Sequence, residues 1–96
     1  MKFEIKNISQ SVNSIMRMIG YLPSYFQENG EFGVVRKLGG GDYPRFHLYI
    51  TQEGQNFSFN LHLDQKKPSY AGSAGHSGEY DGNLVEGEAQ RIKQLL

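Results

Sequence analysis

Apolar and polar residues alternate along four segments of the chain, which is the period of β-strands with one buried face. The segments are residues 2–6, 31–38, 45–52 and 57–64. The alternation is clearest in the last two, whose in-phase apolar residues are Phe46, Leu48, Ile50, Phe59, Leu61 and Leu63. A turn around Gly54 separates these two segments, so the pattern predicts a β-hairpin.

Two other segments have the three- and four-residue apolar spacing of an amphipathic helix. In the first the apolar residues are Ile8, Val12, Ile15, Met16, Ile19 and Leu22, and in the second they are Val85, Ala89, Ile92 and Leu96. Gly20 and Pro23 are expected to end or kink the first helix. Residues 24–29 are expected to add a further helical turn after it.

The order of these elements is β-α-β-β-β-α, and residues 1–96 are expected to form a single domain of the α+β class. We expect a mainly antiparallel four-stranded sheet with both helices on one face, where they cover the alternating apolar residues. The other face is then left to meet water or a partner.

The hairpin also predicts which polar side chains are neighbours on that other face. If the chain turns at Gly54 and Gln55, the apolar residues of the two strands oppose one another, and a shift by one residue would bury the polar set instead. The opposed polar pairs are then His47 with His62, Arg45 with Asp64, and Tyr49 with Asn60. Directly opposed residues have Cβ atoms roughly 4.5–5.5 Å apart, so two of the three histidines are expected to be neighbours.

Residues 65–82 have no period of either kind, and they contain the third histidine, His76. Loops of this length inside a compact domain tend to be functional or disordered. We expect this one to be ordered and to pack partly over the polar face of the hairpin, because Tyr70 and Tyr80 carry large apolar areas. His76 would then come within reach of His62.

Imidazole beside carboxylate suits a metal site, general acid–base catalysis or, with Arg45 and Lys66, phosphate binding. The leading hypothesis for the function is therefore a small ligand- or metal-binding domain, with hydrolase activity left open. Its candidate residues are His47, His62 and His76 for catalysis, Arg45, Tyr49, Asp64 and Tyr80 for ligand binding, and His47, His62 and Asp64 for a divalent metal such as zinc.

Two other interpretations of these residues stay open. The opposed histidines could be a polar cross-strand pair without a function, and Arg45 with Asp64 could be an ordinary exposed ion pair. Alternatively, the domain could be a non-enzymatic interaction module that binds a partner, or a second copy of itself, through the sheet. Tyrosine is frequent at protein interfaces, and the tyrosines expected on or near the polar face are Tyr43, Tyr49, Tyr70 and Tyr80.

The composition narrows the class of partner. Ten Lys and Arg balance ten Asp and Glu, and a net charge of zero argues against a protein held on nucleic acid by bulk electrostatics. A net charge of zero also means that two copies of the chain do not repel each other by their overall charge, so a homodimer remains an alternative. The chain has no cysteine, which excludes disulfides and thiolate chemistry and favours a cytoplasmic location. No apolar run approaches the roughly 20 residues of a membrane span.

Three stretches of the chain resemble a group of short bacterial proteins that have no assigned function. The stretches are residues 43–50, 61–70 and 76–82. The resemblance implies no activity, so the hypotheses above depend on the residues alone.

Overall fold

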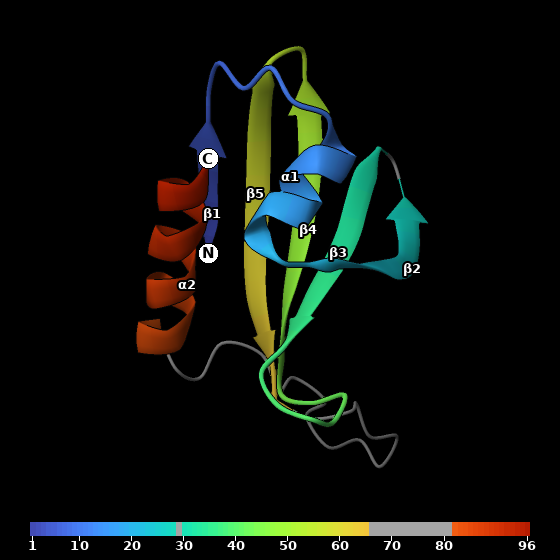
Figure 1. The fold of residues 1–96 in the computed structure, drawn as a ribbon, viewed down its shortest axis with the longest axis vertical. Coiled ribbons are helices and arrows are strands. Elements are labelled where there is room, and N and C mark those ends of the chain that lie inside the picture. Colours follow the sequence, from blue (N-terminus) through green and yellow to red (C-terminus); the bar gives the residue numbers. More distant parts are fainter. Residues whose placement is uncertain (29, 66–81) are drawn as a thin grey trace.

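In the part of the chain that the structure describes, five antiparallel strands form a sheet and two helices pack against it (Figure 1). The structure is a computed structural model, and it describes residues 1–28, 30–65 and 82–96. Along the chain the elements are β1 (Lys2–Ile5), α1 (Val12–Ile19), β2 (Leu22–Glu28), β3 (Glu31–Lys37), β4 (Arg45–Glu53), β5 (Asn56–Asp64) and α2 (Gly82–Leu95). The strands lie side by side in the order β1-β5-β4-β3-β2. The predicted α+β class with an antiparallel sheet is therefore confirmed.

The predicted number of strands is wrong, because residues 22–28 form β2 and not a further helical turn. The element order is β-α-β-β-β-β-α. Gly20 ends α1 in the left-handed conformation, with φ of 83°, which glycine adopts without steric cost. The chain then turns back and pairs with β3 at the edge of the sheet. Pro23 is tolerated there because an edge strand has one side on which an N–H is not needed.

Because β2 follows α1, the side chain that is buried after the helix differs from the predicted one. The helical spacing predicts that Leu22 belongs to the apolar stripe, but Leu22 is 64% exposed and Tyr21 is 2% exposed. The left-handed turn at Gly20 ends the helix, so the helical spacing no longer decides which side chains are buried after Ile19. Leu22 instead pairs with Val35 of β3.

Both helices bury their apolar stripes against the same face of the sheet (Figure 1). Ile15 and Ile19 of α1 and Ala89 and Ile92 of α2 are at most 1% exposed. They share a core with the inward residues of the sheet, which are Val34, Phe46, Leu48, Ile50, Phe57, Phe59, Leu61 and Leu63. The prediction that the helices cover the alternating apolar residues is confirmed.

The hairpin of β4 and β5 has the predicted turn and register. Gly54 has φ of 62°, a value that favours glycine at the first residue of a two-residue hairpin turn. Phe46, Leu48 and Ile50 lie opposite Leu63, Leu61 and Phe59, respectively. Because side chains alternate along a strand, the intervening polar residues all project from the opposite face, which we call the outer face.

The predicted loop at residues 65–82 lies almost entirely outside the described residues, since only its two ends belong to them. Neither of the two described helices is long and apolar enough to cross a membrane.

Candidate functional site

The outer face of the hairpin brings together the polar pairs that the sequence predicts. The pairs are His47 with His62, Arg45 with Asp64, and Tyr49 with Asn60. The first residue of each pair lies on β4 and the second on β5, at the centre of the sheet. Arg45, His47 and Tyr49 are held best, because β4 pairs with β3 on one side and with β5 on the other along these residues. Their side chains therefore project from a rigid support.

The carboxylate of Asp64 lies next to two other members of this group, His47 and Arg45. One of its oxygens, Oδ2, lies 3.4 Å from His47 Nδ1 and 3.7 Å from Arg45 Nε. The contact with the His47 imidazole lowers the pKa of Asp64 most, and the positive charge of Arg45 adds to this effect against the opposing effect of burial. Asp64 is therefore ionised at neutral pH, and a carboxylate at Nδ1 favours the His47 tautomer that carries its hydrogen there.

Tyr49 packs between the two histidines. Its ring stacks on the His47 imidazole with the ring centroids 4.5 Å apart, and the His62 imidazole meets it edge-on at 5.9 Å. Burial raises the pKa of Tyr49, and the nearby carboxylate of Asp64 raises it further. The phenol is thus un-ionised at neutral pH and can donate a hydrogen bond.

His47 is more enclosed than a surface histidine. Its side chain is 12% exposed, and its Nε2 atom is buried without a hydrogen-bond partner among the described residues. A buried nitrogen cannot take a proton from a substrate in this conformation, because a general base must come within hydrogen-bond reach of that proton. His47 is therefore held by Asp64 and Tyr49 as part of the support of the outer face.

The metal hypothesis needs three ligands from this group. Within residues 1–28, 30–65 and 82–96, no group of three or more His, Asp or Glu side chains could hold a metal ion. Two further candidates, His76 and Tyr80, lie outside the described residues. His47, His62 and Asp64 all belong to the described residues, and their arrangement there gives the metal hypothesis no support. Metal binding by these three residues stays a prediction.

A hollow of about 380 Å³ lies on the outer face beside this group, and we call it the Tyr49 hollow. Its lining residues are Lys2, Phe3, Glu4, Glu31, Tyr49, Thr51, Ser58, Phe59 and Asn60. They come from four strands, because β1 pairs with β5 so that Lys2 lies opposite Asn60, and β3 pairs with β4 so that Glu31 lies opposite Thr51. The sequence could have indicated Thr51 and Ser58, which are opposed in the predicted register, but it carried no signal for the pairing of β1.

Replacement of His47 by phenylalanine is expected to raise the pKa of Asp64. Phenylalanine keeps a ring against Tyr49 but removes the nitrogen that lies beside the carboxylate. A titration of the Asp64 side-chain carbon by NMR measures this change. His62→Phe is the matched control and should raise the pKa less, because the charge of His62 is the weakest of the effects on Asp64. An Asp64 titration that His47→Phe leaves unchanged would contradict the geometry.

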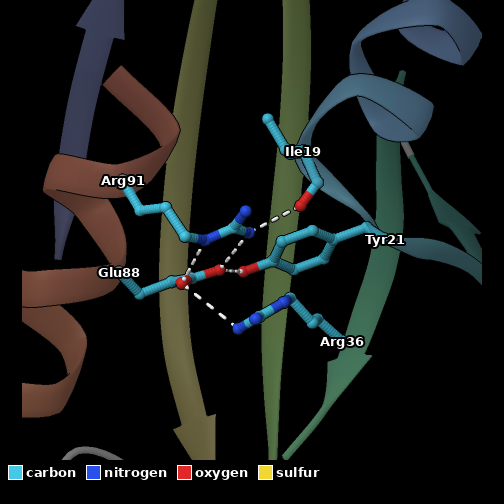
Figure 2. Close-up of polar contacts among 5 residues, drawn as sticks. All are labelled: Ile19, Tyr21, Arg36, Glu88 and Arg91. Carbon is cyan, nitrogen blue, oxygen red and sulfur yellow. Dashed lines mark hydrogen bonds and ion pairs between the residues drawn. The ribbon is translucent and has the colours of Figure 1, made fainter. Parts of the chain in front are cut away.

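A second polar cluster lies on the opposite side of the sheet, between α2 and β3 (Figure 2). The Glu88 carboxylate, whose side chain is 4% exposed, accepts hydrogen bonds from the Tyr21 hydroxyl at 2.6 Å and from Arg91 at 2.8 Å. Arg36 Nη1 lies 3.4 Å from the same carboxylate, and Arg91 also donates to the backbone carbonyl of Ile19. We call these residues the Glu88 cluster, and they join α2 to β3 and to the end of α1.

The Glu88 cluster is a structural feature, because its carboxylate already accepts from donors of the chain itself. Burial opposes the ionisation of Glu88, but the hydrogen bonds from Arg91 and Tyr21 outweigh it and lower the pKa of the carboxyl. The apolar and polar pattern of the sequence did not predict this cluster. A signal was present, since Glu88 stands three residues after Val85 and four before Ile92, within the apolar stripe of the helix.

Comparisons of the chain with protein-family models, with curated proteins and with solved structures found no match.

Proposed function

We propose that this protein is a small-ligand-binding domain, and that the Tyr49 hollow on the outer face of the sheet is its binding site. The observation that carries the proposal is the volume of the hollow, about 380 Å³, beside a group of fixed polar and aromatic side chains. Ligand sites commonly have volumes of about 300–1,000 Å³ and combine apolar walls with a few placed polar groups.

The lining of the hollow favours a planar ligand with both donors and acceptors. Tyr49 supplies the aromatic surface of the hollow on the outer face, and aromatic side chains favour stacked or edge-on contacts with a second ring. Glu4 and Glu31 also line the hollow, and their carboxylates can accept hydrogen bonds. We therefore propose a small heteroaromatic molecule with an amino substituent as the ligand class.

The lining also offers donors to such a ligand. Lys2 provides an ammonium group, Asn60 an amide, and Thr51 and Ser58 hydroxyl groups. The site is braced from one side by the stack of Tyr49 on His47, which limits the entropy lost when Tyr49 meets a ligand. Hydrolysis is not part of the proposal, because His47 Nε2 is buried.

The proposal is tested by an NMR titration of the ¹⁵N-labelled protein with 2-aminopyrimidine. The expected result is a set of amide shifts at Tyr49, Thr51, Ser58 and Asn60, and a loss of affinity of about tenfold in Tyr49→Ala, since stacking on one aromatic ring contributes about 1–3 kcal/mol. Tyr43→Ala is the matched control, because Tyr43 does not line the Tyr49 hollow. Shifts confined to α1 and α2, or none at the solubility limit of the ligand, would contradict the proposal.

Two further outcomes would replace the proposed function. Changes in the imidazole signals of His47 and His62 at micromolar zinc, without binding of 2-aminopyrimidine, would favour the metal hypothesis. A concentration-dependent increase in rotational correlation time, with the largest shifts on the outer face, would favour the interaction module and a homodimer. Both outcomes contradict a free ligand site at the Tyr49 hollow.

A further inference from the structure

The outer face has a second hollow, of about 480 Å³, on the side of the sheet formed by β2 and β3. Its lining residues are Leu22, Pro23, Ser24, Val35, Lys37, Asp42 and Arg45. We call it the Arg45 hollow. It shares no lining residue with the Tyr49 hollow, so it defines a separate site. From its charge and its apolar wall we infer that the Arg45 hollow binds an organic anion with a short apolar tail.

Arg45 is positioned to meet an anionic head group. Its guanidinium carbon lies 4.6 Å from the centroid of the Tyr43 ring, and its Nε lies 3.7 Å from Asp64 Oδ2. These two contacts hold the guanidinium from two sides, while the side chain remains 24% exposed. A guanidinium that is fixed before the ligand arrives loses little entropy on binding, and its planar donors match a carboxylate.

Lys37 supplies a second positive charge at the same hollow. Its Nζ lies 3.0 Å from Asp42 Oδ1, with the two side chains 45% and 74% exposed, respectively. Ion pairs as exposed as this contribute little to stability, because water screens the charges. The ammonium group can therefore exchange Asp42 for a ligand anion at small cost. Lys37 also lies directly opposite Arg45 in the pairing of β3 with β4, so both cations can reach one head group.

The remaining wall of the hollow is apolar. Leu22 is 64% exposed, although it lies on a strand beside Val35, and Pro23 follows it. Among the described large hydrophobic residues that are exposed, Leu22 has the highest exposed fraction. A tail that covered Leu22 would remove apolar surface from water, which is favourable in proportion to the area covered. Cations next to an exposed leucine select an amphipathic anion over an inorganic one.

The test is an NMR titration of the ¹⁵N-labelled protein with hexanoate. The expected shifts are at the amides of Leu22, Val35, Lys37 and Arg45. Lys37→Gln and Arg45→Gln are each expected to weaken binding by about tenfold, which corresponds to the loss of one charge-assisted contact. Arg17→Gln, which removes an exposed arginine of α1, is the matched control and should leave the affinity unchanged.

Two comparisons separate the head group from the tail. Hexylamine has the same tail with a positive head group and should not bind, and inorganic phosphate should bind more weakly than hexanoate. Leu22→Ser is expected to weaken hexanoate binding several-fold without disturbing the fold, because Leu22 is exposed. Equal binding of hexylamine, stronger binding of phosphate, or an unchanged affinity in Leu22→Ser would overturn the inference.

The same titration distinguishes this site from the proposed function. Tyr49→Ala should leave hexanoate binding unchanged, because Tyr49 lies outside the Arg45 hollow. Shifts centred on Thr51, Ser58 and Asn60 with hexanoate would overturn the inference and leave the Tyr49 hollow as the site on this face.

Discussion

Replacement of Glu88 by alanine is expected to lower the free energy of unfolding by about 2–3 kcal/mol. Removal of one partner from a buried ion pair costs about 3–5 kcal/mol. The smaller figure applies here because the side chains of Arg36 and Arg91 remain about a third exposed, so water screens part of their charge. The Tyr21 hydroxyl would lose its acceptor in a position where the residue is 2% exposed. A domain of this length has only about 5–15 kcal/mol of stability in total, so the loss is large.

Urea denaturation followed by circular dichroism measures this effect. Glu86→Ala is the matched control on the same helix, because Glu86 is exposed, and its cost should stay below about 0.5 kcal/mol. Tyr21→Phe removes the hydroxyl from one hydrogen bond and should cost about 1 kcal/mol. If Glu88→Ala and Glu86→Ala cost the same, Glu88 does not hold α2 on the sheet.

The contribution of Glu88 should also depend on pH. Its pKa is lowered in the folded protein, so the unfolded protein binds its proton first as the pH falls. The stability that the ionised carboxyl contributes is therefore fully present above its unfolded pKa of about 4.3 and is lost as the pH falls through the folded pKa. The difference between the wild type and Glu88→Gln should shrink accordingly in acid.

Replacement of Phe59 by alanine is expected to lower the free energy of unfolding by about 3–5 kcal/mol, the usual cost of emptying a buried aromatic site. Phe59 is 2% exposed and stacks on Phe3 at 5.1 Å. The substitution would therefore loosen β1, which pairs with β5 at this position. Ser58→Ala, on the outer face of the same strand, is the control and should cost less than about 0.5 kcal/mol. A reversed order of these two costs would contradict the register of the hairpin.

The hairpin could be predicted from the sequence because its pattern and its turn agree. Phe46, Leu48 and Ile50 alternate with polar residues, and Gly54 stands where the turn needs a positive φ. Since a shift by one residue would bury the polar set, only one register is consistent with a buried apolar face. The pairing of His47 with His62 follows from that register alone.

The edge strand β2 could not be predicted in the same way. Leu22 continues the helical spacing of α1, and Pro23 argues against a strand in the middle of a sheet. Whether residues 22–28 continue the helix or form a strand depends on the backbone conformation of Gly20. The pattern of apolar and polar residues does not specify that conformation. Three lining residues of the Arg45 hollow belong to β2, so this hollow could not be predicted from the sequence either.

The Tyr49 hollow depends on pairings between segments far apart in the chain. Lys2 lies opposite Asn60 because β1 adds to the free edge of β5. No local pattern in residues 2–6 indicates which edge they join or in which register. The candidate residues on the hairpin were therefore placed correctly, whereas the hollow beside them had to come from the tertiary structure.

The central claim is that the outer face of the sheet, and not the helical side, carries the binding site. A crystal structure of the protein soaked with 2-aminopyrimidine tests it most directly. The expected result is density for the ligand in the Tyr49 hollow, in contact with the Tyr49 ring and within hydrogen-bond distance of Glu4 or Glu31. Ligand density against α1 or α2, with the Tyr49 hollow empty in the same crystal, would contradict it.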